Sequence, residues 1–564
     1  MMQKRITGVF IFFIFSTWAI GQNYPRNYFR NPLNIPMQLV ANFGELRANH
    51  WHMGLDIRTQ QKVNLPVHAA AEGYIARVKI EPGGFGRAIY INHPNGYTTL
   101  YAHLNNFFPA LEKYVKAEQY KLESWEVELQ IPENLFPVSK GSFIAYSGTT
   151  GGSQGPHVHF EIRDTKTDEC LNPLLFGLPI ADAVPPTISR LAMYDRNNSV
   201  YLQSPKAIGI KKTGSAYRLA IPSNLVKVFS DKISFAIGAT DRLSNSNNSN
   251  GIYAARILLD GITQSEFVLD RIDYLETRYL NAQIDYRYKF NGGAYLQHLS
   301  PLPGDRSSVY NFPGNDGILH FSDSEVHKVR IEVRDANKNL SALEFSVQYE
   351  PGVMVEEIGA PDKLLPLNVN VFESENFEVF TSEYSVYDTV NVTHTISNVN
   401  GTNVISPVNI FCSASIPTHD FVTVRIKPSI AVEEENRDRV IIKSVAGTRT
   451  VVEKAEWQKD WVAAKFRQFG SFQALIDNEP PTINNPPTDL SRATRLVFHA
   501  KDNFKTIKSF RAEVDGQWLR FTNDKNLAFI YSFDENFPRG EHELKVRVED
   551  VAGNVTEKVW RVRR

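Results

Sequence analysis

The feature that most constrains the fold is the recurrence of short apolar or alternating runs between turn residues. In the first third of the chain such runs occupy Tyr74–Val78, Ala88–His93, Tyr97–His103, Phe143–Tyr146 and His157–Ile162. Asn95-Gly96 separates the second and third runs, and this dipeptide is a strong signal for a β-hairpin. The pattern predicts an antiparallel β domain with few helices.

The length of 564 residues exceeds what one hydrophobic core serves, so we expect about three to five domains. Residues 107–137 interrupt the first β domain with a polar, Lys- and Glu-rich stretch. We expect it to be partly helical over Ala110–Leu129 and to form a lid or wall of any cleft in that domain.

An internal repeat organises the chain beyond residue 183. Pro185-Pro186-Thr187-Ile188 recurs as Pro480-Pro481-Thr482-Ile483, and the segment His327–Asn339 recurs as His542–Asn554. Each copy opens on two prolines and closes on an alternating strand, a D-x-x-x-N turn and a last strand. This layout is typical of immunoglobulin-like β-sandwiches and predicts them over residues 183–350 and 478–564. Residues 351–477 predict a further β domain that ends in a helix, Val452–Phe469.

The N-terminus predicts export. Lys4 and Arg5 precede an apolar run, Val9–Ile20, which is short for a membrane span, and small residues near Gly21 offer a cleavage site. Residues 1–21 are therefore interpreted as a signal peptide, with an uncleaved anchor as the alternative. We expect no membrane span after cleavage, and a location in the periplasm, the cell envelope or the medium.

Charge and cysteine content exclude some classes of function. The net charge of −1 favours neither nucleic acid nor an anionic membrane as a partner. The two cysteines, Cys170 and Cys412, fall in different predicted domains, so we expect two buried thiols rather than a disulfide.

The histidines indicate metal chemistry. Seven of the fourteen lie between His50 and His159. His52-x-x-x-Asp56 pairs an imidazole with a carboxylate, His157-x-His159 places two rings on one face of a strand, and His103 ends another strand. A catalytic zinc needs about three protein ligands and an open position, together with groups that handle protons. Spacing alone does not divide these five residues into ligands and catalytic groups.

Three motifs resemble the lysostaphin/LytM-type zinc endopeptidases. They are Phe43-Gly44 followed by His52–Ile57, the segment from Asn95-Gly96-Tyr97 to Leu104, and the Gly148–Glu161 sequence GTTGGSQGPHVHFE. They occur in the family's order and cover about a quarter of the chain. The resemblance implies a zinc metallopeptidase domain over residues 22–182, with the duplicated-hybrid-motif β fold of the family. The predicted fold class is thus mainly β: an antiparallel β-sheet peptidase domain followed by immunoglobulin-like β-sandwich domains.

The resemblance also implies roles. His52, Asp56 and His159 would bind Zn²⁺, and His103 and His157 would be the catalytic pair, of which either could be the general base. His50, His68 and His93 lie outside the motifs and are interpreted as rim, loop or packing residues. Glu161 and Arg163 are interpreted as structural.

The function implied by the resemblance is hydrolysis of peptide cross-links in bacterial peptidoglycan. The first alternative is an inactive envelope protein that binds wall peptides or activates another cell-wall hydrolase, but such proteins typically lose a metal ligand and this chain keeps all five positions. The second alternative makes the C-terminal β domains the functional part, through adhesion or binding of an envelope protein partner. The bond that is cleaved and the oligomeric state do not follow from the sequence.

Overall fold

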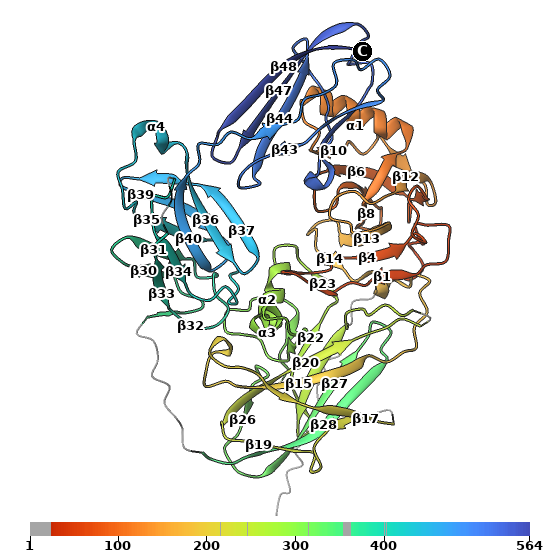
Figure 1. The fold of residues 1–564 in the computed structure, drawn as a ribbon. Helices are drawn as coiled ribbons and strands as arrows, with labels where there is room; N and C mark the ends of the chain where they lie inside the picture. Colours follow the sequence, from red (N-terminus) through yellow and green to blue (C-terminus); the bar gives the residue numbers. More distant parts are fainter. Residues whose placement is uncertain are drawn as a thin grey trace, which may run out of the picture.

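A computed structural model describes residues 24–214, 216–244, 246–313, 315–352, 362–399, 401 and 403–564. The predicted signal peptide, residues 1–21, lies outside this range. The chain is mainly β, with many antiparallel sheets, as the sequence predicts. We refer to four parts of the chain: the N-terminal domain (24–182), the second domain (183–352), the third domain (362–477) and the C-terminal domain (478–564). Figure 1 shows them arranged in a ring, in which the C-terminal domain returns to the N-terminal one.

The N-terminal domain has one large and one small antiparallel sheet. The large sheet has the order β1 (Leu39–Ala41), β4 (Leu55–Arg58), β13 (His157–Asp164), β8 (Tyr97–Ala102), β7 (Arg87–Asn92), β6 (Gly73–Ile80) and β10 (Val127–Gln130), with β11 (Pro137–Val138) on β6 and β14 (Cys170–Leu171) on β13. The small sheet is β5 (Pro66–His68), β12 (Phe143–Ser147) and β9 (Leu104–Phe107), and β2 (Leu46–Arg47) and β3 (His50–Trp51) form a separate hairpin. The predicted hairpin at Asn95-Gly96 is confirmed, because β7 and β8 pair there and Gly96 has a φ of 83°.

The insertion at residues 107–137 is partly helical, as predicted, but its helix is shorter than expected. Helix α1 covers Pro109–Lys121 and ends before Ser124-Trp125, after which the chain enters β10. Leu111 and Val115 are buried on the core of the N-terminal domain. The alternating residues of β10 bury one face, which explains why a period-two segment does not continue the helix.

The second domain has two sheets that share one core. The first contains β16 (Lys206–Ile208), β15 (Thr187–Asp195), β20 (Lys232–Thr240), β24 (Gln297–His298) and β26 (Leu319–His320). The second contains β17 (Ile210–Thr213), β18 (Ala216–Leu219), β28 (Leu340–Tyr349), β27 (Val326–Arg334), β21 (Ala254–Leu259), β22 (Ile262–Val268), β25 (Tyr310–Asn311) and β19 (Leu225–Val228). Strand β23 (Arg271–Ile272) leaves the second domain to pair with β14. Helices α2 (Leu280–Gln283) and α3 (Tyr286–Phe290) follow it.

The third domain consists of strands, including the segment predicted as a helix. Its sheets are β29 (Lys363–Leu364) with β32 (Val390–Asn391); β30 (Asn370–Glu373), β31 (Phe377–Thr381), β35 (Val422–Ile426), β39 (Trp461–Phe466) and β38 (Glu456–Gln458); and β33 (His394–Ser397), β34 (Val408–Phe411), β40 (Gly470–Ile476), β36 (Val440–Ala446) and β37 (Arg449–Lys454). A one-turn helix, α4, covers Glu434–Arg437.

The helix predicted at Val452–Phe469 is wrong. Strands β37, β38 and β39 occupy this segment, and Lys459 turns the chain with a φ of 61°. The turn at Lys459 divides the segment into strands that pair antiparallel, β37 with β36 and β39 with both β38 and β35.

The C-terminal domain repeats the strand pair that closes the second domain. Its strands are β41 (Thr482–Ile483) with β43 (Ala500–Lys501), β42 (Arg495–Phe498) with β46 (Phe529–Ser532), and the sheet β45 (Gln517–Trp518), β44 (Ile507–Val514), β47 (Glu541–Asp550) and β48 (Val555–Arg563). Pairs β27–β28 and β47–β48 are the two copies of the repeat found in the sequence. The immunoglobulin-like topology of both domains stays a prediction.

Helix α1 contacts the C-terminal domain through polar and aromatic side chains. Lys116 forms an ion pair with Asp534 at 2.9 Å, and Tyr120 donates a hydrogen bond to the same carboxylate at 3.0 Å. The ring of Tyr120 also meets that of Trp518 edge to face, with centroids 5.4 Å apart. The insertion therefore carries an interdomain contact as well as part of the N-terminal core (Figure 1).

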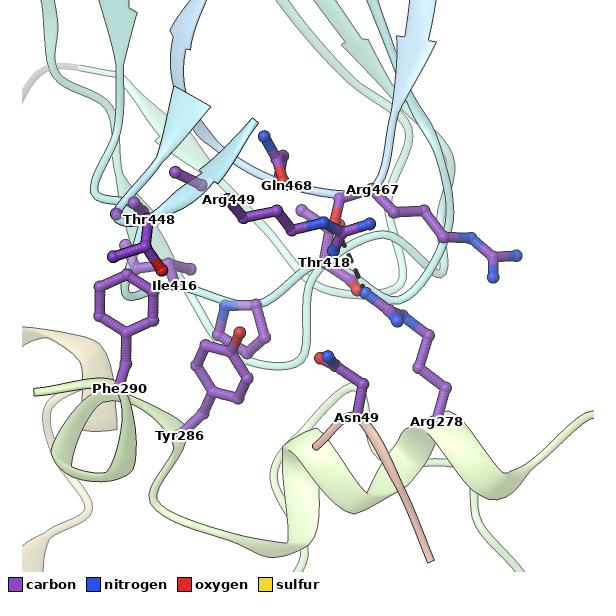
Figure 2. Close-up of a pocket in the computed structure, with 14 residues that line it drawn as sticks. Asn49, Arg278, Tyr286, Phe290, Ile416, Thr418, Thr448, Arg449, Arg467 and Gln468 are labelled. Carbon is purple, nitrogen blue, oxygen red and sulfur yellow. Dashed lines mark hydrogen bonds between the residues drawn. The ribbon is translucent and has the colours of Figure 1, made fainter. Parts of the chain in front are cut away.

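The junction of the second and third domains encloses a cavity of about 360 Å³. Figure 2 shows Tyr286 and Phe290 rising into it from α3, with Thr448 and Arg449 on the opposite side. Arg278 closes one end and donates to the backbone oxygen of Thr418 at 2.9 Å. The cavity contains none of the five residues predicted to bind metal or act in catalysis.

Both cysteines are buried free thiols, as predicted. Among the described residues, no helix combines the length and the hydropathy needed to cross a bilayer.

Candidate metal centre

The register of the large sheet brings the predicted ligands together. Strand β13 pairs with β4 so that His159 lies directly opposite Asp56. His52 lies four residues before Asp56, on the segment that leads into β4. On the other side of β13, β8 ends at Ala102, the partner of His159, so that His103 follows at the same edge. Residues distant in sequence thus meet because three neighbouring strands present them at one place.

One atom of each predicted ligand points to a common position. His52 Nε2 lies 3.0 Å from Asp56 Oδ1 and 3.0 Å from His159 Nδ1, and the latter two atoms are 2.9 Å apart. Tetrahedral zinc with bonds of roughly 2.0–2.1 Å separates its ligand atoms by about 3.3 Å. The triangle is therefore close to the dimensions that zinc requires.

Hydrogen bonds to the outer ring nitrogens fix which nitrogen faces that position. His52 Nδ1 lies 2.7 Å from the backbone oxygen of Asn42, and His159 Nε2 lies 2.8 Å from Glu161 Oε1. Because each outer nitrogen donates to an oxygen, His52 Nε2 and His159 Nδ1 present lone pairs to the centre. Second partners of this kind are common for metal-bound histidines.

The chemistry of the three atoms fits a divalent cation. Once His159 has lost its second proton, two imidazole lone pairs and a carboxylate oxygen, all on buried side chains, face one another at about 3.0 Å and repel. A metal ion satisfies all three, and a nitrogen-rich set with one carboxylate is typical of catalytic zinc sites. The residues present therefore fit the zinc ion that the sequence predicts.

Arg47 holds the second oxygen of Asp56. Its Nη2 donates to Asp56 Oδ2 at 2.6 Å, which leaves Oδ1 directed at the two imidazoles. Burial would raise the pKa of Asp56, but the neighbouring His52 and hydrogen bonds from His157 and His159 keep it well below its usual value. The carboxylate is thus charged and oriented before any metal binds.

His159 lies between two carboxylates. Burial would lower its pKa, but hydrogen bonds to Asp56 and Glu161 raise it to about 9. In the absence of metal the proton of this imidazolium compensates the charge of Asp56, so that metal binding displaces a proton.

His103 and His157 lie beside the triangle, and their rings meet edge to face with centroids 4.7 Å apart. His103 Nδ1 lies 2.8 Å from the backbone oxygen of Thr150, and His157 Nδ1 lies 2.8 Å from that of Gly155. Both rings therefore present Nε2 to the site, and His157 Nε2 is 3.4 Å from Asp56 Oδ1. Burial, and then the charges of His159 and His157, lower the pKa of His103 to about 3.

The backbone at His103 is unusual. Its φ is 58°, a left-handed conformation that non-glycine residues rarely adopt. Two hydrogen bonds hold it, from His103 N to the oxygen of Phe85 and from Nδ1 to Thr150.

Glu161 connects the centre to the second domain. Its carboxylate accepts from Arg163 Nε at 2.7 Å, and from the hydroxyl of Tyr274 at 2.6 Å. Tyr274 follows β23, the strand that the second domain contributes to the large sheet. Burial would raise the pKa of Glu161, but the charge of Arg163 and the hydrogen bond from His159 lower it to about 2.

The sequence indicates part of this surrounding set. Glu161 lies within the recognised motif, and its interpretation as a structural residue agrees with its place behind His159. Arg47, Asn42 and Tyr274 carry no spacing signal. Arg47 lies on β2, Asn42 follows β1, and Tyr274 follows β23 of the second domain. Only the three-dimensional fold identifies them.

None of the remaining histidines of the region contributes an atom to the triangle. His50 is exposed and bonds to the oxygen of Ala48, and His68 packs at the sheet edge near Pro32. His93 is buried between the oxygen of Glu72 and the hydroxyl of Thr99. The structure agrees with rim, loop and packing roles for all three.

Two glycine loops lie next to His103 and His157 and approach each other closely. A Cβ atom at Gly151 would lie 2.2 Å from the backbone nitrogen of Gly86, and Gly151 has a φ of 67°. The loop of the C-terminal domain around Asp524 reaches this point, where Gly151 N donates to Asp524 Oδ1 at 2.7 Å. Lys525 continues the contact through its backbone nitrogen to Pro82 O at 2.7 Å and its ammonium group to Ser153 O.

Two protein families match parts of the chain. Residues 50–120 match peptidase family M23, and residues 364–477 match the Zu5-like domain. The first match contains His52, Asp56 and His103.

Curated relatives match about a quarter of the chain. An uncharacterized metalloprotease of Haemophilus influenzae is 30% identical over 165 residues, which cover 28% of this chain and 29% of the relative. The DD-carboxypeptidase/endopeptidase Mpg of Neisseria meningitidis is 34% identical over 128 residues, 23% of each protein. The peptidoglycan DD-endopeptidase ShyA of Vibrio cholerae is 26% identical over 171 residues, 29% of this chain and 33% of ShyA.

Solved structures with similarity include the catalytic domain of lysostaphin from Staphylococcus simulans, at 22% identity and a TM-score of 0.18, covering 24% of this chain and 87% of that one. A zinc-containing peptidase from Vibrio cholerae has 25% identity and a TM-score of 0.18, covering 24% and 37%. The chain spans less than a third of the length of the first curated relatives it matches. Its N-terminal domain belongs to peptidase family M23, the lysostaphin/LytM type, and further β domains follow, among them a Zu5-like domain.

Proposed function

We propose that the protein is an exported zinc metalloendopeptidase that hydrolyses peptide cross-links of bacterial peptidoglycan. The observation that carries the proposal is the convergence of His52 Nε2, Asp56 Oδ1 and His159 Nδ1 within 3.0 Å, beside a second pair of imidazoles. The substrate class rests on the names of the relatives Mpg and ShyA.

The residues of the proposed centre have different roles, which follow from their positions. When bound, zinc would supply a Lewis acid that polarises the scissile carbonyl and lowers the pKa of a water molecule. His52, Asp56 and His159 hold the ion, and Arg47 and Glu161 orient two of these ligands.

His103 and His157 supply the proton chemistry. Each has Nδ1 fixed on a backbone oxygen, so Nε2 is the atom available to accept a proton or donate to the developing oxyanion. The two rings share the roles of base and oxyanion donor.

Cleavage of cross-linked muropeptides tests this function. The purified full chain should convert cross-linked dimers to monomers, and chelation should stop the reaction. The His103→Ala and His157→Ala chains should keep zinc and lose at least about 100-fold in rate, the range for loss of general acid–base catalysis. The matched control is His50→Ala, which removes an exposed ring near the site and should leave the rate unchanged.

Two outcomes separate the alternatives. A zinc-free, inactive wild type that still binds peptidoglycan would establish the non-enzymatic envelope protein. Full activity of the His103→Ala chain would overturn the catalytic assignment while leaving the metal site in place.

A further inference from the structure

Two clusters of three aspartates occupy equivalent positions in the second and C-terminal domains. In each cluster the three carboxylates offer oxygen atoms that all lie within 4.8 Å of one another. One member precedes the Pro-Pro-Thr-Ile segment, one follows the strand that pairs with that segment, and one opens the D-x-x-x-N turn. The clusters are Asp182, Asp241 and Asp335, and Asp477, Asp502 and Asp550.

The hydrogen bonds of the two clusters are also the same. Asn339 Nδ2 donates to Asp335 Oδ2 at 2.6 Å and to the backbone oxygen of Asp182 at 3.4 Å. Asn554 Nδ2 donates to Asp550 Oδ2 at 2.9 Å and to the backbone oxygen of Asp477 at 2.8 Å. The same arrangement is therefore built twice, and equivalent aspartates lie 215 to 295 residues apart in the sequence.

Buried carboxylate oxygens in both clusters have no partner among the described residues. Asp241 is 4% exposed and Asp477 is 1% exposed, yet Asp241 Oδ1 and Asp477 Oδ2 accept no hydrogen bond there. Asp182 Oδ2 and Asp502 Oδ1 are in the same situation. An unpaired buried carboxylate oxygen is costly, so these atoms indicate a missing ligand.

No side-chain cation compensates the clusters. Within the part of the chain that the structure describes, none of the six aspartates forms an ion pair with Lys, Arg or His. Arg439 lies near the second cluster but directs Nη1 to the backbone oxygen of Ala552. Burial, and then the charge of Asp335, raise the pKa of Asp241 to about 7. Three adjacent carboxylates in this setting either take up protons or bind a cation.

We propose that each cluster binds one calcium ion, and that the two ions fix the linkers that lead into the second and the C-terminal domains. The ligands are oxygen atoms only, which suits calcium and disfavours zinc. Calcium also accepts irregular sets of carboxylates and backbone carbonyls, whereas magnesium demands an octahedron and keeps several waters.

The first ion would stabilise a loop that supports the zinc centre. Asp241 and Asn250 pair through their backbones at the base of this loop. The next residue, Gly251, exchanges two hydrogen bonds with the Asn42 side chain, and the Asn42 backbone oxygen binds His52. The second ion would fix the linker after β40 and so the position of the C-terminal domain, which contacts α1 and the loop at Gly151.

Calcium titration of the full chain tests the proposal. After dialysis into calcium-free buffer with one equivalent of zinc, isothermal titration should give two calcium ions per chain. Calcium in large excess should raise the melting temperature by about 5 °C or more. The Asp56→Ala chain, which lacks the zinc site, should still bind two. A wild type that binds no calcium at millimolar concentration overturns the proposal.

Isosteric variants locate the ions. Asp241→Asn and Asp502→Asn should each bind one calcium, and the double variant none. Without calcium each variant should melt at the same temperature as the wild type or higher, because a repulsive charge is removed; with calcium it should melt lower. This reversal separates loss of a site from a folding defect. Glu373→Gln, an exposed carboxylate of β30, is the matched control and should keep two ions. Two ions on the double variant would also overturn the proposal.

Discussion

At the scale of single residues, a few side chains bind the proposed zinc ion and others orient these ligands. The spacing of the histidines indicates five candidate residues, and the family resemblance of the motifs around them implies that His52, Asp56 and His159 are the ligands. The sequence does not predict Arg47, Asn42 or Tyr274, because these contacts depend on a hairpin and on another domain. The ligand set can thus be read from the sequence, whereas the groups that orient it cannot.

Glu161→Gln should weaken zinc binding by about tenfold to 100-fold, since the carboxylate that accepts from His159 Nε2 becomes neutral. Competition with a zinc-binding dye measures the affinity. At saturating zinc the rate of muropeptide cleavage should change by only a few-fold. Glu128→Gln, at an exposed position of β10, is the control. Unchanged affinity in the Glu161 variant would show that Glu161 does not support zinc binding through His159.

At the scale of secondary structure, the strands follow from the sequence pattern, whereas the loops between them shape the site. The strands β6, β7, β8, β12 and β13 follow from alternation and turn residues, and they form where the sequence predicts them. The predicted helix at Val452–Phe469 fails because the turn at Lys459 carries no glycine or proline signal. The close approach of Gly86 and Gly151 also has no local signal beyond the glycines themselves.

Gly151→Ala should reduce the cleavage rate at least about tenfold without loss of zinc. The added methyl group would meet the backbone of Gly86, and the positive φ adds strain, so the loop that holds His103 through Thr150 must shift. Zinc content and cleavage rate of the same preparation measure both effects. Gly155→Ala is the control, because its Cβ meets nothing within 4 Å. Equal rates for the two variants would contradict a positioning role of the loop contact.

The first aspartate cluster makes the stability of the second domain depend on pH. Burial and the charges of Asp335 and Asp182 raise the pKa of Asp241 to about 7 in the folded chain, against about 3.9 when unfolded. The folded state therefore binds the extra proton between these values. Without calcium, the free energy of unfolding should rise as the pH falls from about 7 toward 4.

Denaturant titrations of the wild type and Asp241→Asn across this pH range measure the difference. The variant should show a weaker rise, and calcium should reverse the slope in the wild type, since binding needs the deprotonated carboxylate. Identical pH profiles for both chains would contradict the raised pKa.

At the scale of the whole molecule, the C-terminal domain lies at the edge of the proposed zinc site. Its loop at Asp524 and Lys525 contacts Gly151 and Ser153, and the side chains of His103 and His157 are largely buried. The sequence predicts the repeated domains but not their return to the peptidase domain, because that contact depends on α1 inside the insertion.

Lys116→Glu should release this domain and increase the rate of muropeptide cleavage several-fold, because it places a carboxylate against Asp534 and Glu535. Small-angle scattering should show a larger radius of gyration. The double variant Lys116→Glu with Asp534→Lys restores opposite charges and should recover both wild-type values. Release of the domain with no change in rate would show that the contact does not restrict the site.

We propose that three side chains from distant parts of the chain hold a single zinc ion. An anomalous difference map at the zinc absorption edge, from a crystal of the full chain, tests it most directly. We expect one strong peak roughly 2.0–2.2 Å from His52 Nε2, Asp56 Oδ1 and His159 Nδ1. A zinc-soaked crystal with no peak there, or with zinc bound only to other residues, would contradict it.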